Sequence, residues 1–396
     1  MFCGHAEFIV TQTDVNIEAE ALLDGIITSS PSGVESLFNK TLQLKQSGLF
    51  TGDFTDLASR AAEGNSLVIG TNPAPSSVVY PQKSSTDAPY SASEASLRSA
   101  VKIPTSFTFG QKPPVILVPG TASTGYIAFV GNYLKLLTGQ SYADPVWLDV
   151  PNYLLGDAQV NAEYVAYAIN YISSISNNQN VSVIAWSQGN LNTQWALKYW
   201  PSTRGIVSDF ISMSADFHGT TEAYLICLSA PELGCTPSVI QQEYESLYVN
   251  ALRRNGGDSA YVPTTSIYSA TDDIVQPQSG TGASAFLQDG RNFGVTNAEL
   301  QTICPGQPAG GVVSHGDVLI NALAYALAVD ALTHDGPGSL SRIDLPTVCA
   351  QPIAPGLDLN DFLLNESTSI FALLAISEYN PKVAVEPPLK SYALLN

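Results

Sequence analysis

Ser187 has the sequence surroundings of a nucleophilic serine. It follows the apolar run 181–186 (VSVIAW), which predicts a buried strand, and it precedes a run of helical character. A serine on such a strand-to-helix turn is held in a strained backbone conformation that raises its hydroxyl above the sheet. Gly189 matches the G-x-S-x-G pattern of this turn, whereas Ala185 departs from it but is still small. An ordinary strand-to-helix turn is the alternative for this motif alone.

Two later segments supply the partners that a nucleophilic serine needs. Residues 266–278 (SIYSATDDIVQPQ) contain a strand candidate followed by Asp272 and Asp273, and residues 310–317 (GGVVSHGD) carry His315. The order serine, acid, histidine is the one expected for a triad built on a strand-to-helix serine. Such a triad performs acyl transfer, because the histidine activates the serine for attack on a carbonyl carbon. Spacing alone does not choose between the two aspartates.

A fourth segment can stabilise the negative charge that forms during acyl transfer. Residues 115–125 (VILVPGTASTG) predict a strand that ends in a Gly-Thr loop. A loop after an early strand commonly supplies one oxyanion donor, and the residue after the serine supplies another. We therefore expect Thr121 to give a backbone N–H, and its hydroxyl is a second possible donor. The backbone N–H of Gln188 is expected to complete the oxyanion hole, although Thr121 alone also fits an ordinary turn.

The elements around these residues alternate between strands and helices. Helical spacing occurs over 160–171 and 191–199, and short apolar runs predict strands at 114–118, 146–150, 181–186, 210–213 and 266–269. Short apolar strands that alternate with helices predict a parallel sheet covered on both faces. In such sheets, ligands bind beyond the carboxyl ends of the strands, which is where Ser187 and Asp272 would lie.

Residues 1–90 differ in character from residues 91–396, which we interpret as the catalytic domain. Apolar residues at helical spacing, which predict short amphipathic helices, are Val34, Leu37, Phe38 and Leu42, and then Phe54, Leu57 and Ala61. Residues 72–93 combine four prolines with many serines, a composition typical of linkers. We expect residues 1–90 to be an N-terminal extension or pro-segment. A small helical subdomain without a separate role is the alternative.

Composition excludes several classes of function. The 396 residues carry a net charge of −19, so no basic face is available for nucleic acid. The four histidines and five cysteines show neither HExxH nor CxxC spacing, and we predict no metal and no cofactor. The longest apolar stretch, residues 318–329, is far shorter than the roughly 20 residues that span a bilayer, so we expect no transmembrane segment.

Four of these segments together resemble the lipase B-like family of α/β-hydrolases, the group around Candida antarctica lipase B. The matching stretches are LVPGTASTG at 117–125, WSQGN at 186–190, DFHGTT at 216–221 and VPTTSIYSATDDIVQPQ at 262–278. Their order and approximate spacing also agree, and the resemblance extends from about residue 90 to the C-terminus. It implies an α/β-hydrolase fold with helices on both faces of the sheet, and a lipase that cleaves carboxylic esters of lipids.

The resemblance also implies roles for individual residues. It assigns Ser187 as the nucleophile, Asp272 rather than Asp273 as the triad acid, and His315 as the base. The same resemblance places Thr121 and Gln188 in the oxyanion hole. It further implies a substrate pocket formed by Trp186 on the alcohol side, with Asp216 and Gln242 on the acyl side. Without the resemblance, a core aromatic would be the preferred interpretation of Trp186.

The cysteines depart from the family pattern of three disulfides. Cys304 and Cys349 correspond to one family pair, whereas Val146 and Val385 stand where half-cystines of the other two are expected. Cys227 and Cys235 lie in an insertion after the DFHGTT run, near the pocket mouth in the family. We expect this second pair to close a small looped lid, with two free thiols as the alternative. Cys3 is left over, in a segment that could be removed.

Cysteine pairs together with the N-x-[ST] triplets at Asn39, Asn180 and Asn365 favour a secreted glycoprotein. The first ten residues form a poor signal peptide, so we infer a start further upstream. Residues 362–376 are rich in Leu, Ile and Phe, which suits either a helix over the pocket entrance that contacts lipid or a helix packed on the core. The triplet at Asn365 conflicts with lipid contact.

Three functions are compatible with these observations. The first is a secreted, monomeric lipase that acts on lipid esters. The second is a carboxylesterase or acyltransferase that acts on soluble esters, because the same triad serves both. The third is a non-catalytic relative that binds lipid or a protein partner, although an intact serine, aspartate and histidine set argues against it.

Overall fold

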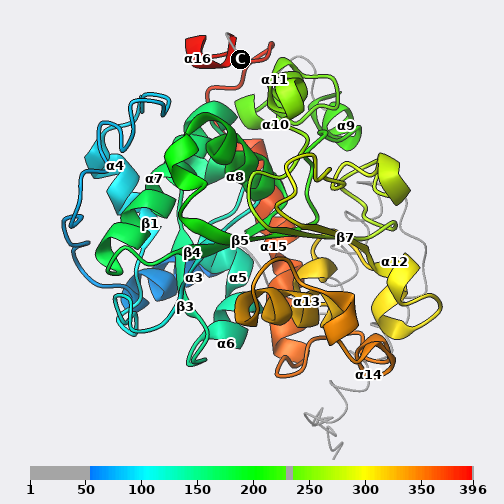
Figure 1. The fold of residues 1–396 in the computed structure, drawn as a ribbon. Coiled ribbons are helices and arrows are strands. Elements are labelled where there is room, and N and C mark those ends of the chain that lie inside the picture. The colour runs from blue at the N-terminus through cyan, green and yellow to red at the C-terminus, as the bar shows by residue number, and fades with distance from the viewer. Residues whose placement is uncertain (1–53, 229–234, 395–396) are drawn as a thin grey trace, which may run out of the picture.

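The chain folds around a twisted sheet (Figure 1). The computed structural model describes residues 54–228 and 235–394, and within them seven strands lie in the order β1-β3-β2-β4-β5-β6-β7. Neighbouring strands are parallel except for the pair β1 and β3. The strands are β1 (Val101–Lys102), β2 (Pro114–Val118), β3 (Asp144–Leu148), β4 (Val181–Trp186), β5 (Val207–Met213), β6 (Thr264–Tyr268) and β7 (Val295–Glu299).

Helices cover both faces of the sheet. The longer helices are α3 (Phe54–Leu67), α7 (Ala158–Ile175), α8 (Gln188–Tyr199), α13 (Ala322–Thr333) and α15 (Leu359–Glu378). The shorter ones are α4 (Glu94–Ala100), α5 (Gly125–Phe129), α6 (Tyr133–Leu137), α9 (Glu222–Leu228), α10 (Pro237–Gln241), α11 (Leu247–Arg253), α12 (Leu300–Ile303), α14 (Leu345–Cys349) and α16 (Ser391–Leu394). In the described residues, no helix has the length and apolarity that crossing a bilayer requires.

Alternation along the strands produces two hydrophobic cores. Ile116 and Val118 of β2 pack in the core beneath α7 and α8, whereas Val115 and Leu117 pack in the core with α5, α6 and α13. The central strands are therefore buried on both faces, which is why they read as continuous apolar runs rather than as alternating ones. The doubly covered, mostly parallel sheet expected from the sequence is confirmed. The strand expected at 146–150 is shifted to 144–148.

Residues 68–93 are packed against the domain, although their composition is typical of a linker. The side-chain amide of Asn72 donates to the carbonyls of Arg98 and Val101 at 2.7 Å each. Tyr90 stacks on Trp200 with ring centroids 5.7 Å apart. The serines find partners on α7, where Ser174 Oγ accepts a hydrogen bond from the Ser77 backbone N–H at 3.0 Å. Serine and proline content predicts a lack of regular structure, but it does not predict a lack of contacts.

The helix α3 confirms the helical spacing after residue 54, and it packs against α5. Arg60 Nη1 donates to Ser367 Oγ at 2.6 Å, and its guanidinium lies 5.1 Å from the ring centroid of Phe371 on α15. A Cβ at Gly64 would meet the ring of Tyr126 at 2.7 Å, so helix and ring are in close contact. Residues 34–42, Cys3 and the triplet at Asn39 lie outside the described residues.

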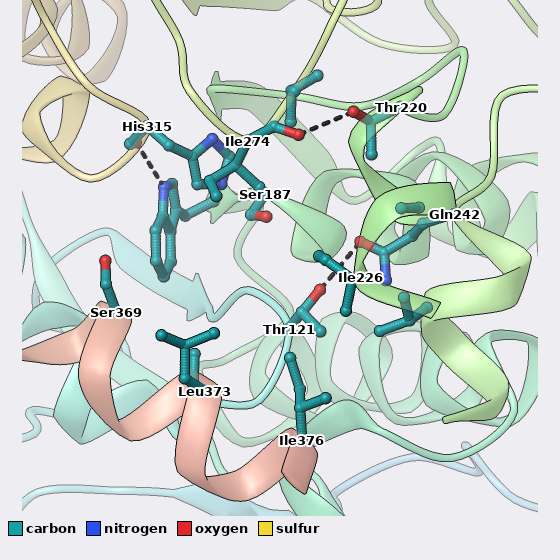
Figure 2. Close-up of a pocket in the computed structure, with 15 residues that line it drawn as sticks. Thr121, Ser187, Thr220, Ile226, Gln242, Ile274, His315, Ser369, Leu373 and Ile376 are labelled. Atoms are coloured by element: carbon teal, nitrogen blue, oxygen red, sulfur yellow. Dashed lines mark hydrogen bonds between the residues drawn. The ribbon is translucent and has the colours of Figure 1, made fainter. Parts of the chain in front are cut away.

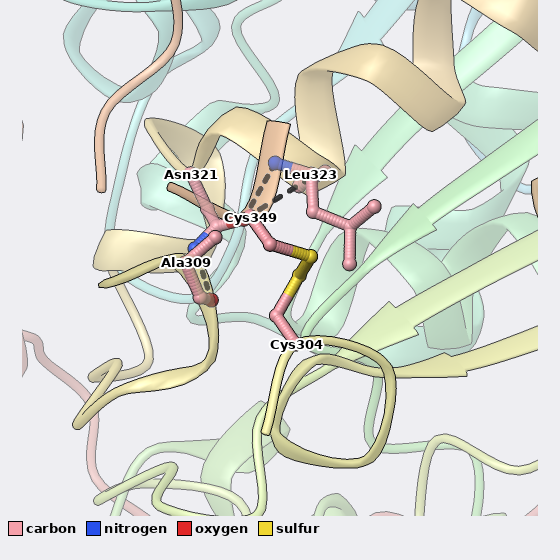
Figure 3. Close-up of a disulfide and its surroundings, with 6 residues drawn as sticks. Cys304, Ala309, Asn321, Leu323 and Cys349 are labelled. Carbon is pink, nitrogen blue, oxygen red and sulfur yellow. Dashed lines mark hydrogen bonds between the residues drawn. A yellow bond between two sulfur atoms is a disulfide. The ribbon is translucent and has the colours of Figure 1, made fainter. Parts of the chain in front are cut away.

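Two disulfides form between the described cysteines, as expected. Cys304–Cys349 joins the end of α12 to α14 across 45 residues that include His315 (Figure 3). In the chain-entropy model a loop of that size stabilises the fold by about 4 kcal/mol. Cys227–Cys235 joins α9 to the start of the α10 segment. Residues 229–234, the greater part of the expected lid loop, lie outside the described residues.

Candidate active site

Ser187 occupies a sharp turn between β4 and α8. Its backbone has φ 54° and ψ −132°, a combination that is unfavourable for a residue with a side chain. A Cβ at Gly189 would lie 2.6 Å from the carbonyl oxygens of Val118 and Pro119, and a Cβ at Gly120 would lie 2.7 Å from Ser187 Cβ. The close approach of the β2 loop and α8 therefore requires glycine at both positions, and the strained serine is positioned by its neighbours.

His315 lies in a turn just before the short helical segment Asp317–Leu319, and its imidazole is hydrogen-bonded to Asp272. The distances from His315 Nδ1 to Asp272 Oδ2 and Oδ1 are 2.9 and 3.1 Å. His315 Nε2 is buried without a hydrogen-bond partner among the described residues, and the ring faces the same pocket as Ser187 (Figure 2). Asp273 Oδ1 accepts a hydrogen bond from the backbone N–H of His315 at 2.9 Å. The geometry therefore favours Asp272 for the imidazole.

The electrostatics of this pair favour a charged imidazole during reaction. Burial lowers the pKa of His315, but the charge of Asp272 and its hydrogen bond, helped by Asp273 and Asp216, raise that pKa above the ordinary histidine value. Asp272 is fixed in turn, because its Oδ1 accepts from the backbone N–H groups of Ile274 and Val275 at 2.9 and 2.8 Å. An imidazole with this environment can accept a proton from a serine hydroxyl.

Hydrogen-bond donors converge next to Ser187. Gln188 is the first residue of α8, and a backbone N–H in the first helical turn has no acceptor within its own helix. Thr121 Oγ1 lies 2.9 Å from Gln188 Oε1 and 2.9 Å from Gln242 Oε1. Since a hydroxyl has a single proton, Thr121 donates to only one of these amides at a time. Thr121 lines the pocket that also contains Ser187, whereas Gln188 is not among the residues that line it and adjoins the serine along the backbone.

The walls of the pocket around Ser187 are mainly apolar. Besides Thr121, Ser187, Gln242 and His315, the lining consists of Trp186, Thr220, Ala223, Ile226, Val239, Ile274, Val275, Ser369, Ala372, Leu373 and Ile376. Figure 2 shows Ser369, Leu373 and Ile376 pointing into the pocket from α15. An apolar pocket with a few polar groups at one point suits a substrate with a hydrocarbon chain and one polar reacting centre.

The helix α15 covers residues 362–376, and the expected packing on the core is confirmed, whereas the expected contact with lipid stays a prediction. One side lines the pocket, and other residues pack on the domain, where Phe371 is 1% exposed. Asn365 is also buried: its Oδ1 accepts from Asn132 Nδ2 and its Nδ2 donates to the Gly316 carbonyl, both at 3.0 Å. A glycan cannot be attached to a side chain in this environment without unpacking it. The N-x-[ST] triplet at Asn365 is therefore not a usable site in this fold.

Trp186 and Asp216 differ in how they relate to the pocket. Trp186 lines it, and its Nε1 donates to the backbone carbonyl of His315 at 3.1 Å. Asp216 is buried and is not among the residues that line the pocket, in contrast to the role implied by the resemblance. Neither carboxylate oxygen of Asp216 has a hydrogen-bond partner among the described residues.

The buried carboxyl group of Asp216 gives a pH-dependent prediction. Burial raises the pKa of Asp216 from 3.8 to about 7, against the opposing effect of a charged His315. Above pH 3.8 the unfolded chain loses the Asp216 proton, whereas the folded chain keeps it until about pH 7. The free energy of unfolding therefore falls as the pH rises through this range, by a total on the order of 4 kcal/mol. Asp216→Asn should remove this loss of stability, so its gain in unfolding free energy should be larger at pH 8 than at pH 4.

Urea unfolding of the wild type and Asp216→Asn at both pH values measures this difference. A gain of equal size at pH 4 and pH 8 would show that folding does not raise the pKa of Asp216, because the gain depends on pH only if the pKa differs between the folded and unfolded states. The opposite sign, a loss of stability confined to high pH, would show that a charged Asp216 has a partner.

In the described part of the chain, no three histidine, cysteine or acidic side chains gather in a cluster that could hold a metal ion. The polar groups at the pocket include two serines, two threonines, one glutamine and one imidazole with its carboxylate. These groups are sufficient for acyl transfer through a covalent intermediate.

Comparison with known proteins identifies the family. Lipase B of Pseudozyma antarctica is 35% identical over 286 residues, which are 71% of this chain and 79% of that protein. The chain belongs to the lipase B family of α/β-hydrolases. The crystal structure of Aspergillus fumigatus lipase B agrees, with a TM-score of 0.81 and 47% identity over 95% of this chain and 94% of that one. No protein-family model matches the chain.

Membership of the lipase B family confirms the α/β-hydrolase fold and the activity class, a carboxylic ester hydrolase of the lipase and esterase type. The match to the Aspergillus fumigatus structure covers 95% of this chain, which is more than residues 91–396 alone could account for. The likeness therefore extends into the first 90 residues. Sequence reasoning did not identify the apolar pocket wall formed by Ile226, Val239, Ile274 and Val275. No local pattern distinguishes such residues from ordinary core residues.

Proposed function

We propose that the chain hydrolyses carboxylic esters of lipids with Ser187 as nucleophile, His315 as general base and Asp272 as the triad acid. The observation that carries this proposal is the strained Ser187 turn in one pocket with a buried imidazole. Its Nδ1 is bound by Asp272, and its Nε2 has no hydrogen-bond partner in the part of the chain that the structure describes. A base that must take a proton from a substrate-bound serine needs such an uncommitted nitrogen.

The reaction then follows from these groups. His315 Nε2 takes the hydroxyl proton as Ser187 Oγ bonds to the ester carbonyl carbon, and Asp272 stabilises the imidazolium that results. The backbone N–H of Gln188 and the N–H and hydroxyl of Thr121 donate to the oxyanion. The C–O bond to the alcohol breaks as His315 returns the proton to the leaving oxygen. Water, or another alcohol, then attacks the acyl-enzyme by the same steps in reverse.

The lining of the pocket favours a lipid-like substrate over a small soluble ester. Ile226, Val239 and Val275 line the pocket, as do Leu373 and Ile376 of α15. Together they can bury a hydrocarbon chain at roughly 25 cal/mol per Å² of apolar surface removed from water. A carboxylesterase or an acyltransferase with the same triad is the alternative, and only the preference for acyl chain and acceptor separates them.

Hydrolysis of p-nitrophenyl esters from acetate to palmitate tests the proposal. We expect turnover that rises with chain length beyond acetate, and complete inactivation by a p-nitrophenyl organophosphonate with one equivalent bound at Ser187. A profile that peaks at acetate would favour the carboxylesterase. If the wild type neither hydrolysed any of these esters nor reacted with the organophosphonate, the triad proposal would be wrong and a non-catalytic lipid binder would be favoured.

We also propose that the enzyme acts outside the cell as a monomer. The two disulfides support the extracellular location, because disulfides persist in oxidising compartments. Of the two N-x-[ST] triplets in the described residues, Asn180 is exposed and Asn365 is buried, so a glycan would be accepted at Asn180 only. The division at residue 90 stays a prediction, but the contacts of Arg60 with α15 favour a structural role for the last part of the extension.

A further inference from the structure

His315 is held by hydrogen bonds to its backbone as well as by the hydrogen bond to its ring. The His315 N–H donates to Asp273 Oδ1 at 2.9 Å, and its carbonyl oxygen accepts from Trp186 Nε1 at 3.1 Å and Ser214 Oγ at 3.2 Å. All of these partners are buried, and Asp273 is 3% exposed. The N–H and the carbonyl of His315 are therefore both hydrogen-bonded to side chains from other parts of the chain.

This arrangement compensates for the place of His315 in the fold. His315 lies in a turn, so no helix or strand ladder fixes its backbone. Asp272 binds one ring nitrogen, but that contact alone still allows the ring to swing as the Cα position moves. Proton transfer requires Nε2 within hydrogen-bond reach of the serine oxygen, and misplacement by about 1 Å can cost about 10²-fold in rate.

We propose that Asp273 is a positioning residue for the reaction, which holds the backbone of His315 through its N–H and adds a second buried negative charge beside the imidazole. The proposal rests on the proposed function, because it gives Asp273 a task only if His315 is the base. It assigns different work to two adjacent carboxylates: Asp272 binds the ring of the histidine, and Asp273 binds its main chain.

The charge of Asp273 affects the pKa of His315, which its hydrogen bond to the backbone alone would not do. The acidic groups that act on His315 are Asp272, Asp273 and Asp216, and each raises the pKa of the imidazole against the effect of burial. Burial raises the pKa of Glu222, and the charge of Asp273 raises it further. Removing the charge of Asp273 should lower the pKa of His315, so that the free base persists to lower pH.

Three substitutions separate the two contributions. Asp273→Asn can keep an acceptor for the His315 N–H but loses the charge, Asp273→Ala loses both, and Asp273→Glu restores the charge on a longer side chain. Asp289→Asn is a matched control, because Asp289 also accepts from backbone N–H groups of a loop, those of Phe293 and Gly294 at 2.9 and 3.1 Å, without contact to His315.

The experiment measures kcat, KM and the pH dependence of kcat/KM with p-nitrophenyl butyrate for the wild type and these four variants. We expect Asp273→Ala to lower kcat about 10- to 100-fold with little change in KM. Both Asp273→Ala and Asp273→Asn should move the acidic limb of kcat/KM to lower pH. Asp273→Glu should return that limb toward its wild-type position, and Asp289→Asn should leave it unchanged.

The outcomes decide the proposal in either direction. Unchanged kcat and an unmoved acidic limb in Asp273→Asn and Asp273→Ala, with an active wild type, would show that Asp273 does not position the base. A lower thermal midpoint without movement of the limb in the folded Asp273→Asn variant would reduce its role to stability. An inactive wild type that also fails to bind the organophosphonate would instead refute the triad, and this result is distinguishable because it precedes any comparison of variants.

Discussion

Ser187→Ala should lower kcat/KM for p-nitrophenyl esters by about 10⁵-fold or more, to the level of the buffer. The substitution removes the hydroxyl that we propose bonds to the carbonyl carbon, in the pocket that His315 also lines. His315→Ala should have an effect of similar size, because the serine is a weak nucleophile without a base. The double variant should be no worse than either single variant, since groups that act in one step are not additive.

The fold provides the control for this result. Alanine at position 187 keeps the backbone of the turn, including the hydrogen bond from its N–H to the Met213 carbonyl at 3.1 Å, and the strain at φ 54° is unchanged. We therefore expect the thermal midpoint of Ser187→Ala to stay within a few degrees of the wild-type value. A folded Ser187→Ala variant that retains a tenth of wild-type turnover would place the nucleophile elsewhere.

The sequence alone is sufficient to propose the triad, because its members stand close to elements with a clear pattern and in a defined order. Ser187 ends a continuous apolar strand, and Asp272 and His315 stand in the order that the fold requires. The choice between Asp272 and Asp273 has no local signal, because both follow β6 and both are buried beside His315. Only the spatial arrangement shows that one carboxylate contacts the ring and the other the backbone N–H.

Other expectations depended on neighbours that no local pattern encodes. The apolar character of residues 362–376 predicts burial, but it does not specify whether pocket or core provides it, and α15 contacts both. A triplet such as Asn365-Glu-Ser specifies a modification only where the side chain is accessible, and Asn365 is bonded to Asn132 instead. The resemblance implies a place for Asp216 in the substrate pocket, but the side chain is not among the residues that line it. Whether a side chain reaches a pocket depends on the residues packed around it.

The second large effect is expected at Thr121. Thr121→Val removes a hydroxyl of nearly the same shape that lines the pocket beside Ser187, and it leaves the backbone N–H in place. Loss of one oxyanion donor typically lowers kcat by about 10²- to 10³-fold, and we expect a loss of that size here. KM should change little, because the hydrogen bond to the carbonyl oxygen strengthens only as negative charge develops in the transition state.

The neighbours of Thr121 explain why its hydroxyl is available for this task. Gln242 Nε2 donates to the Ser238 carbonyl at 2.9 Å and Gln188 Nε2 donates to the Leu154 carbonyl at 3.1 Å, so both amide oxygens are turned toward Thr121. These two acceptors hold the hydroxyl near the pocket, and an oxyanion is a stronger acceptor than either amide. The hydroxyl can therefore change partner during the reaction without moving to a new position.

Thr121→Ser is the matched control, because it keeps the hydroxyl and loses only a methyl group. We expect it to retain most of the wild-type kcat, and the contrast with Thr121→Val then isolates the hydroxyl from the packing of the side chain. Steady-state kinetics with p-nitrophenyl butyrate measure both variants, and their thermal midpoints test for a general loss of stability. If Thr121→Val kept more than half of kcat, the backbone N–H groups of Thr121 and Gln188 alone would have to stabilise the oxyanion.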